Sequence, residues 1–466
     1  MAGALRAIGA GPGDRVAVLC GTRPEMVVAR DAASRGEMMV VPLYPQLAGP
    51  EVAYVLEHAR PRALLVEAAH RAAAAHAVDM LSARDRPAIV ELPPVIGAAV
   101  GPPGCRRPPA EAAEVGATLL YTSGTTGRPK GCVRTAAQES ARAAELTATY
   151  RLGPDDVHLV ACPLAFSAPG ILLRAARRAG ATTVLLPRFS AAGFLAAASA
   201  CRATVFFLVP TQYQRLLELP AAERDRFDRS AVRAALVAGA PMPPALRHKI
   251  VEWLGPGRLW EFYGSSETGT ITVLDPDQQL THADTVGRPA PGVEIQLRGG
   301  SADPDAPREI LVRSPTVMAG YWNPATRAAD WPGTDDRFVS VGDLGHIEAG
   351  GHLRLVDRVH DTIISGGINV HPAEVERALH EHPEVAGAVV FGVTDPDWQE
   401  RVAALVVRAP GSTVDEAELR RFLREHLAPH KLPGSIVFVD ADELPLTPSG
   451  KPLRRIAARL FAEHRR

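Results

Sequence analysis

The sequence predicts an α/β protein with a large N-terminal domain of doubly wound sheets, a β-rich subdomain, and a small α+β domain at the C-terminus. Three observations lead to this prediction. The chain has 466 residues, 46% of them hydrophobic, and a single core stops growing at roughly 250 to 300 residues. Short β-branched runs alternate with helical stretches over about the first 290 residues. Beyond them the pattern changes to strands and turns.

The alternating pattern starts near residue 14. Apolar β-branched runs typical of buried parallel strands cover residues 15–19, 38–42, 63–66, 181–186, 204–209 and 234–237. Segments 24–35 and 51–59, rich in Ala, Leu, Val and Arg, are typical of the helices between such strands. Strand–helix–strand units of this kind build parallel sheets with helices on both faces.

The β-rich subdomain is expected at about residues 290–357, and an α+β pattern follows it. In this last part we expect helices at 372–380 and 414–426 and strands at 385–393, 402–407 and 436–439. We therefore divide the chain into an N-terminal domain, 1–359, and a C-terminal domain, 360–466.

Charge and composition exclude several classes of function. The 51 basic and 52 acidic residues give a formal net charge of -1, which is not the footprint of a nucleic-acid binder. No apolar stretch reaches the roughly 20 residues that cross a bilayer. The five cysteines are odd in number and widely spaced, so they form neither a disulfide framework nor a metal motif. We expect a cytoplasmic protein that binds neither nucleic acid nor membrane.

Lysine is rare in this chain. Only four of the 51 basic residues are lysines, at positions 130, 249, 431 and 451, and the others are arginines. Codon bias in a GC-rich genome accounts for the general trend. It does not account for the lysines that remain, so their surroundings are informative.

One lysine closes a loop of glycines and hydroxyl residues. Segment 121–131 reads Tyr-Thr-Ser-Gly-Thr-Thr-Gly-Arg-Pro-Lys-Gly and follows an apolar strand. Backbone N–H groups and hydroxyls in such a loop can surround phosphate oxygens, and glycine permits close approach. The spacing of a Walker A loop is not met. A Ser/Thr/Gly loop alone is more often an ordinary surface loop, but Lys130 favours a phosphate site.

On this motif the sequence resembles the adenylate-forming (ANL) superfamily, which includes acyl-CoA synthetases, the adenylation domains of peptide synthetases and firefly luciferase. The likeness spans nearly the whole chain. It implies that the loop is mobile and holds the β- and γ-phosphates of ATP. The residues that it assigns to phosphate binding are Thr122, Ser123, Gly124, Thr125, Thr126, Gly127 and Lys130.

A second motif, Glu-Phe-Tyr-Gly-Ser-Ser-Glu-Thr-Gly at 261–269, is similar to the family's Tyr-Gly-x-Thr-Glu element. Alone, it would be typical of a solvated turn. By resemblance Tyr263 flanks adenine, and Ser266, in place of the commoner threonine, contacts the α-phosphate or the carboxylate. Glu267 holds Mg²⁺, which suits a hard carboxylate together with phosphate oxygens.

Further nucleotide contacts are implied on both sides of this motif. The loop of Gly239, Ala240 and Pro241 resembles the one that lines the adenine pocket. Asp343 would accept hydrogen bonds from both ribose hydroxyls, a role suited to a two-oxygen acceptor. Arg358 would contact ribose or phosphate. A lone Asp or Arg is usually a surface charge, so these roles rest on the family likeness.

The C-terminal motifs imply a domain that moves. The family's hinge falls at His360, where Asp or Lys is usual. Segment 364–376 resembles the Gly-Gly-x-Asn-Val-x-Pro-x-Glu-Val-Glu signature and places Gly366 and Gly367 along a narrow pantetheine tunnel. Segment 446–451, Leu-Thr-Pro-Ser-Gly-Lys, resembles the family's Gly-Lys tail and makes Lys451 the catalytic lysine.

The implied activity uses ATP and Mg²⁺ to activate a small acid as its acyl adenylate, with release of pyrophosphate. The acyl group then passes to a thiol, with CoA as the expected co-substrate, after the small mobile domain rotates. The resemblance makes Lys451, Glu267 and Ser266 the catalytic residues. The residues expected to border the acid pocket are Phe166, Thr211, Gly264 and Ser265.

Departures from the family pattern leave alternatives open. Phe166 stands where the family commonly has His, near the acyl pocket and the thiol entrance. The acceptor could instead be a carrier-protein thiol or an amine, or the acid could be nitrite activated for diazotisation of an aryl amine. A non-catalytic nucleotide-binding protein is the alternative of another class, and the presence of Lys130, Glu267, Asp343 and Lys451 argues against it. The identity of the acid stays open, as does a homodimer.

Overall fold

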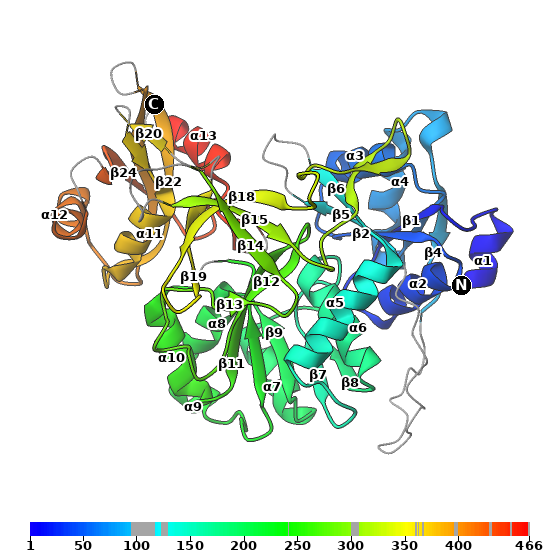
Figure 1. The fold of residues 1–466 in the computed structure, drawn as a ribbon, viewed down its shortest axis with the longest axis horizontal. Coiled ribbons are helices and arrows are strands. Elements are labelled where there is room, and N and C mark those ends of the chain that lie inside the picture. Colours follow the sequence, from blue (N-terminus) through cyan, green and yellow to red (C-terminus); the bar gives the residue numbers. More distant parts are fainter. Residues whose placement is uncertain are drawn as a thin grey trace.

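The structure, a computed structural model, contains four β-sheets among the residues that it describes (Figure 1). It describes residues 1–94, 117–122, 129–240, 242–299, 307–358, 361, 363–365, 368–395, 399–427, 431–447 and 450–464. The predicted α/β class with a small C-terminal α+β part is confirmed. Among the described residues, no helix is long and apolar enough to span a membrane.

The first sheet has eight strands in the order β17-β16-β6-β5-β2-β1-β3-β4. Its strands are β1 (Arg15–Leu19), β2 (Met39–Leu43), β3 (Ala63–Val66), β4 (Ala88–Glu91), β5 (Thr118–Thr122), β6 (Lys130–Arg134), β16 (Gly320–Asn323) and β17 (Ala328–Asp330). Its helices are α1 (Ala2–Ala7), α2 (Pro24–Arg35), α3 (Gly49–Ala59) and α4 (Arg71–Asp79), with short 3-10 turns at Ala68–His70 and Ala83–Asp85. Because β1 and β3 are buried along their whole length, they read as continuous apolar runs.

The second sheet has seven strands in the order β13-β12-β11-β10-β9-β7-β8. These are β7 (Val157–Val160), β8 (Thr182–Leu185), β9 (Val205–Leu208), β10 (Ala234–Val237), β11 (Leu259–Ser265), β12 (Gly269–Leu274) and β13 (Arg288–Pro289). Its helices are α5 (Ala136–Thr149), α6 (Ser167–Arg178), α7 (Ala191–Ala200), α8 (Pro210–Leu217), α9 (Ala221–Arg224) and α10 (Pro244–Leu254). Figure 1 shows α5 and α6 on the side of this sheet that faces the first one.

The β-rich region is less self-contained than the sequence suggested. Its four-stranded sheet consists of β14 (Glu294–Arg298), β15 (Arg308–Arg313), β18 (Val339–Ile347) and β19 (Leu353–Arg358). However, β16 and β17 leave it and extend the first sheet, since Tyr321 pairs with Cys132 of β6. The bounds of the β-rich subdomain, about 290–357, stay a prediction, and within them these two strands pair with the first sheet. Their short, mixed sequences showed no sign of a partner strand almost 190 residues earlier.

In the residues that the structure describes, the C-terminal part forms a five-stranded sheet with three helices. Its elements are β20 (Ile363–Ser365), β21 (Ile368–Val370), α11 (Pro372–Glu381), β22 (Val385–Asp395), β23 (Gln399–Arg408), α12 (Glu416–His426), β24 (Ser435–Phe438) and α13 (Arg454–His464). The predicted helices and strands are all present, with ends shifted by a few residues. A domain boundary between 359 and 360 stays a prediction.

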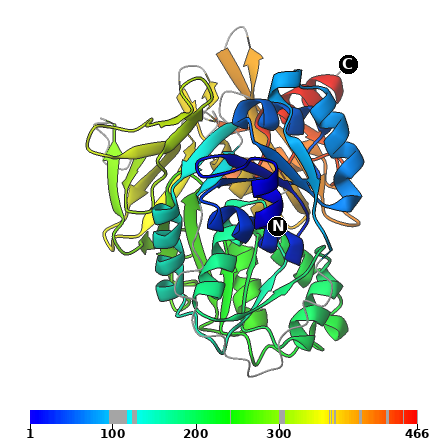
Figure 2. The same cartoon turned by 90° about the vertical axis from the view of Figure 1, so that its right-hand side faces the viewer.

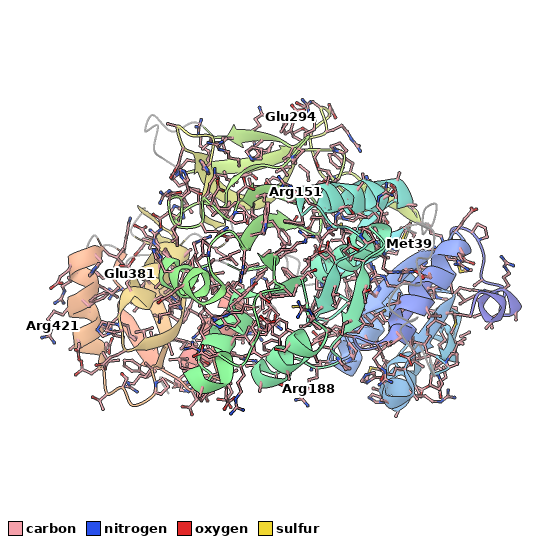
Figure 3. The ribbon with its side chains drawn as sticks, turned by 90° about the horizontal axis from the view of Figure 1, so that it is seen from below. Met39, Arg151, Arg188, Glu294, Glu381 and Arg421 are labelled. Atoms are coloured by element: carbon pink, nitrogen blue, oxygen red, sulfur yellow. The ribbon has the colours of Figure 1, made fainter. Side chains whose placement is uncertain are left out.

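The sheets pack around separate cores that meet at α6. Leu173 of α6 and Leu164, in the turn before this helix, share a buried cluster with Val16 and Val18 of β1. Figure 2 shows the first sheet above the second, with the β-rich sheet to one side. In Figure 3, Glu381 and Arg421 of the C-terminal part lie at the opposite end of the molecule from Met39. The nucleotide motifs lie where these bodies meet.

Candidate active site

The two central sequence motifs meet through a hydrogen bond. Thr122, the last residue of β5, donates its hydroxyl to Oε1 of Glu267 at 3.1 Å, across 145 residues of chain. Tyr321 of β16 donates its hydroxyl to the same oxygen at 3.2 Å. Glu267 is only 9% exposed. Its carboxylate is therefore a fixed acceptor between the two sheets.

A tight hairpin presents this carboxylate. β11 and β12 pair antiparallel with a register shift at Gly264, and the turn covers 266–268. The Ser265 hydroxyl accepts hydrogen bonds from the backbone N–H groups of Glu267 and Thr268, both at 3.1 Å. A Cβ on Gly264 would lie 2.1 Å from the Gly269 carbonyl oxygen, where no atom fits. Gly264 and Ser265 were expected to border the acid pocket. In the structure they shape the turn that carries Glu267.

Arg134 supports the turn from beneath, and the sequence analysis missed it. Its Nε donates to the Ser266 carbonyl at 2.6 Å, and its Nη1 donates to the Thr316 carbonyl. The side chain is fully buried. The available signal was an arginine at the end of strand β6, directly after the apolar pair Cys132 and Val133, since a buried charge needs partners. These bonds fix the backbone immediately before Glu267.

Glu139 compensates part of a buried group of guanidinium ions. Its carboxylate lies 3.1 Å from Nη1 of Arg142 and 3.8 Å from Nε of Arg134, and it also pairs with Arg174. Thr118 donates its hydroxyl to the same carboxylate at 3.1 Å. Burial alone would raise the pKa of Glu139, but these arginines lower it to about 2. Glu139 therefore stays ionised inside the protein.

Lys130 and Tyr321 form a second contact at the end of the β5–β6 hairpin. The ammonium of Lys130 lies 5.2 Å from the centroid of the Tyr321 ring, a cation–π distance. Because the Tyr321 hydroxyl also bonds Glu267, one aromatic side chain contacts both the cation and the carboxylate of the site. The lysine that the sequence singled out thus lies beside the predicted metal ligand.

Tyr263 and Asp343 also meet, from different sheets. The Tyr263 hydroxyl donates to Oδ2 of Asp343 at 2.5 Å, and Asp343 is 8% exposed. On the neighbouring strand β19, Arg358 is the residue directly paired with Asp343. The predicted adenine and ribose residues therefore lie side by side.

The lysine turn of the C-terminal part reaches the second sheet. The backbone N–H of Lys451 donates to the Thr447 hydroxyl at 2.9 Å, and Thr447 N–H returns a bond to the Lys451 carbonyl at 2.8 Å. Gly450, at φ +81°, packs so closely that a Cβ there would lie 3.1 Å from Cγ2 of Thr211. Thr211, in the first turn of α8, was expected to border the acid pocket. It contacts the lysine turn.

Phe166 lies at the N-terminus of α6 and packs against Tyr44 from the end of β2, with ring centroids 5.1 Å apart. Both side chains are half-buried. The adjacent Ser167 hydroxyl accepts a hydrogen bond from Arg142 at 3.0 Å. The predicted pocket residues Phe166 and Thr211 thus follow the carboxyl ends of β7 and β9, where ligands of parallel sheets bind.

Several predicted site residues lie outside the described residues or have undescribed side chains. These are Ser123, Gly124, Thr125, Thr126, Gly127, Pro241, His360, Gly366, Gly367 and the side chain of Arg358. Gly239, at φ +93°, and Ala240 follow β10 as expected for a loop. Their contacts with adenine stay predictions.

The donor set at Glu267 fits magnesium. In the part of the chain that the structure describes, no three His, Cys, Asp or Glu residues group as metal ligands. One carboxylate beside a threonine hydroxyl is what a protein supplies when substrate phosphates and water complete the octahedron of Mg²⁺. The same set does not suit zinc, which prefers nitrogen and sulfur ligands.

The chain is similar to known proteins along nearly its whole length. The family model of the AMP-binding enzyme matches residues 1–322, and that of the AMP-binding enzyme C-terminal domain matches 374–451. Feruloyl-CoA synthase of an Amycolatopsis species is 34% identical, covering 99% of this chain and 91% of that protein. 2-Succinylbenzoate–CoA ligase of Bacillus licheniformis is also 34% identical, covering 97% and 91%.

Solved structures of known proteins are similar to this one over nearly the whole chain. The amide bond synthetase McbA from Marinactinospora thermotolerans has a TM-score of 0.84 and 32% identity, covering 99% of this chain and 92% of that one. ATP-bound MatB from Rhodopseudomonas palustris has a TM-score of 0.84 at 28% identity, covering 100% and 92%. MenE from Bacillus subtilis, solved with the acyl-adenylate intermediate OSB-AMP, has a TM-score of 0.80 at 29% identity, covering 97% and 90%.

Proposed function

The chain belongs to the AMP-binding enzyme family, and from that premise we propose that it joins a small carboxylic acid to CoA through an acyl adenylate. It is an AMP-forming acid–thiol ligase. Relatives named as CoA ligases, at 34% identity over nearly the whole chain, support this activity. The observation that carries it is the Thr122–Glu267 hydrogen bond, because it joins the phosphate-loop motif to the metal-binding motif.

In the first half-reaction, a carboxylate oxygen of the acid attacks the α-phosphorus of ATP. The new phosphorus–oxygen bond forms as the bond to the β-phosphate breaks, and pyrophosphate leaves with the electron pair. The Lys451 ammonium, held in its turn by Thr447, would stabilise the charge that spreads over the phosphate oxygens. Catalysis then consists of positioning and electrostatics.

The N-terminal residues would hold the nucleotide. Lys130 and the Thr122 hydroxyl would bind the β- and γ-phosphates, and Glu267 with Thr122 would hold magnesium, which supplies positive charge to the phosphates. Tyr263 would flank adenine beside Gly239 and Ala240. Asp343 would exchange its bond to the Tyr263 hydroxyl for bonds to the ribose hydroxyls, as a two-oxygen acceptor can.

In the second half-reaction, the thiolate of CoA attacks the acyl carbon of the adenylate. The carbon–sulfur bond forms, the carbon–oxygen bond to phosphate breaks, and AMP leaves with the electron pair. We assign the domain rotation that admits the thiol to a hinge at His360, with Gly366 and Gly367 lining the tunnel. The contact of Gly450 with Thr211 fits the conformation that precedes this rotation.

The acid is best sought among aryl and arylalkyl carboxylates. Relatives of this chain are named for feruloyl-CoA, 2-succinylbenzoate and indoleacetate, and Phe166 with Tyr44 offers an aromatic wall.

An amine is the second acceptor worth testing, because Phe166 replaces the histidine common in CoA ligases and one structural relative is an amide bond synthetase. A carrier-protein thiol is the third. The reduced cysteines Cys20, Cys132, Cys162 and Cys201 fit a cytoplasmic enzyme.

The test measures pyrophosphate and AMP release from ATP and Mg²⁺ with ferulate, 2-succinylbenzoate, indoleacetate, short aliphatic acids and nitrite. Each acid is supplied alone, with CoA, and with an aryl amine. We expect pyrophosphate release with an aryl acid and AMP release that depends on CoA. AMP release that depends on the amine and ignores CoA would keep the adenylation chemistry and replace the acceptor. No pyrophosphate release with any acid, while ATP binds, would refute the proposal.

A further inference from the structure

The end of the β5–β6 hairpin projects beyond the strands beside it. On one side β5 pairs with β2 through Thr118 only, and on the other β6 pairs with β16 through Cys132 and Val133. At the tip, Thr122 pairs with Lys130, so among the described strand pairings these two residues have only each other. An unsupported hairpin end is mobile unless other groups hold it.

Helix α3 holds both arms of this tip. The Tyr54 hydroxyl donates to the Pro129 carbonyl at 3.0 Å, immediately before Lys130. His58 Nδ1 lies 2.8 Å from the Tyr121 hydroxyl, immediately before Thr122. Tyr54 and His58 are four residues apart and thus lie on one face of the helix. One helical face therefore contacts the two residues that flank the phosphate-binding pair.

Ring packing makes these contacts rigid. The rings of Tyr54 and His58 stack at 5.7 Å and 28°, and His58 meets Tyr121 edge-on at 5.7 Å and 81°. Both α3 side chains are half-buried. Aromatic pairs at these distances stabilise each other beyond their burial. The helix therefore holds the tip through packed rings as well as through hydrogen bonds.

The helix is in turn tied to the strand that carries Tyr321. Trp322 of β16 donates its indole N–H to the His58 carbonyl at 3.0 Å. Between them the hairpin is tightly packed, since a Cβ on Gly131 would lie 3.2 Å from Cβ of Trp322 and 2.9 Å from Leu119. Since Tyr321 contacts both Lys130 and Glu267, α3, the hairpin and the metal-binding turn form one connected unit.

We propose that Tyr54 and His58 are positioning residues that fix Thr122 and Lys130 for the β- and γ-phosphates of ATP. They touch no substrate and act through the backbone of the hairpin. The proposal rests on the function assigned above, in which Thr122 and Lys130 bind those phosphates. It adds α3, a helix outside every sequence motif, to the nucleotide site.

The test compares ligands that differ only in the phosphates concerned. Tyr54→Phe and Tyr121→Phe each remove one hydroxyl and keep the ring packing. We expect either variant to weaken binding of Mg²⁺–ATP and of pyrophosphate by roughly 3- to 10-fold, the range for one hydrogen bond. Binding of AMP should change less than 2-fold. Titration calorimetry gives all three dissociation constants without knowledge of the acid.

The matched control is Tyr150→Phe, since the Tyr150 hydroxyl is buried and has no hydrogen-bond partner among the described residues. It should leave the three dissociation constants unchanged, and thermal unfolding checks that each variant is folded. If Tyr54→Phe weakened the binding of ATP and AMP equally, Tyr54 would have a general structural role, and the proposal would be overturned. Unchanged binding of ATP would also overturn it. Failure of the proposed function gives a different result, because the wild-type chain would then release no pyrophosphate with any acid, whatever the dissociation constants of the variants.

Discussion

The N-terminal and C-terminal sides of the site are held in different ways. On the N-terminal side, Glu267 accepts hydrogen bonds from Thr122 and Tyr321, and Asp343 accepts one from Tyr263. Both carboxylates are at most 9% exposed. These bonds join residues 54 to 145 positions apart, so the folded core itself fixes the two carboxylates.

On the C-terminal side, the lysine lies in a turn that forms local hydrogen bonds. Lys451 bonds Thr447 within a local turn, and the helix after it is anchored by Arg454, which lies 2.9 Å from Glu376 and 3.5 Å from Asp361. Gly450 packs beside Thr211, where a Cβ at position 450 would lie 3.1 Å from Cγ2 of Thr211. The comparison teaches that the groups expected to bind nucleotide are built into the core, whereas Lys451, the proposed catalytic cation, belongs to the part that we propose to withdraw after adenylation.

Among the substitutions proposed here, replacement of Lys451 should have the largest effect on activity. We expect Lys451→Ala to slow adenylation on the order of 10²- to 10³-fold, the range for losing one group that stabilises transition-state charge. Thioester formation from supplied acyl adenylate should change little, because the lysine has withdrawn by then. Acid-dependent pyrophosphate exchange and single-turnover thioester formation measure the two steps. Lys249→Ala, an exposed lysine of α10, is the control and should affect neither.

The buried charges of the N-terminal side predict that the free energy of unfolding decreases at acid pH. The pKa of Glu139 is about 2 in the folded protein, against an ordinary value of 4.5 for a glutamate exposed to solvent in the unfolded chain. Its stabilisation is therefore complete above pH 4.5 and is lost as the pH falls toward 2, amounting to roughly 3 kcal/mol. We expect Glu139→Gln to be less stable at pH 7 and to lack this part of the pH slope.

Urea unfolding between pH 2 and 7 measures this effect of Glu139. If the stability of Glu139→Gln falls as steeply with decreasing pH as that of the wild type, groups other than Glu139 cause the pH dependence. Glu418→Gln, an exposed residue of α12, serves as the charge-matched control and should keep the wild-type slope.

Asp343→Asn tests whether the N-terminal side binds nucleotide as a preformed site. An amide offers one acceptor oxygen in place of two and no charge. We expect ATP and AMP binding to weaken together by roughly 10- to 100-fold, the range for hydrogen bonds to a charged group. Equal effects on both nucleotides would separate this ribose contact from the phosphate contacts of Thr122 and Lys130. Weakening of ATP alone would contradict the assignment.

Arg134→Lys should have a smaller effect on the same side. A lysine keeps the charge but cannot reach the Ser266 and Thr316 carbonyls with two fixed donors. We expect the Mg²⁺ concentration for half-maximal pyrophosphate release to rise roughly 3- to 10-fold, since one hydrogen bond near Glu267 is lost. An unchanged magnesium dependence with a lower folding stability would make Arg134 purely structural.

Lys431→Met should have the smallest effect, on the C-terminal side. Lys431 lies 2.6 Å from Glu374, and both side chains are about one-quarter exposed. Solvent screens such pairs, so the loss should be at most about 1 kcal/mol. Thermal unfolding should shift by a few degrees, and adenylation should stay within 2-fold. A large loss of adenylation would show that this ion pair positions the lysine turn.

Much of the fold and site could be predicted from the sequence because the signals are local. Buried strands such as Ala63–Val66 are continuous apolar runs, and the helix at Pro24–Arg35 has the predicted bounds. Phosphate chemistry needs glycine, hydroxyls and lysine close together in the chain, so the segment around Lys130 was visible without a structure. The rarity of lysine drew attention to Lys451 in the same way.

Tertiary structure alone decided which distant residues support those motifs. Nothing local indicates that β16 would pair with β6, that Arg134 would hold the Ser266 carbonyl, or that Thr211 would contact the lysine turn. Tyr54 and His58 likewise read as ordinary residues of an amphipathic helix. The physical reason is that chemistry at a phosphate fixes residue types within a short loop, whereas supporting contacts depend only on proximity in space. Many residue types can make such contacts, and packing of the whole chain selects among them.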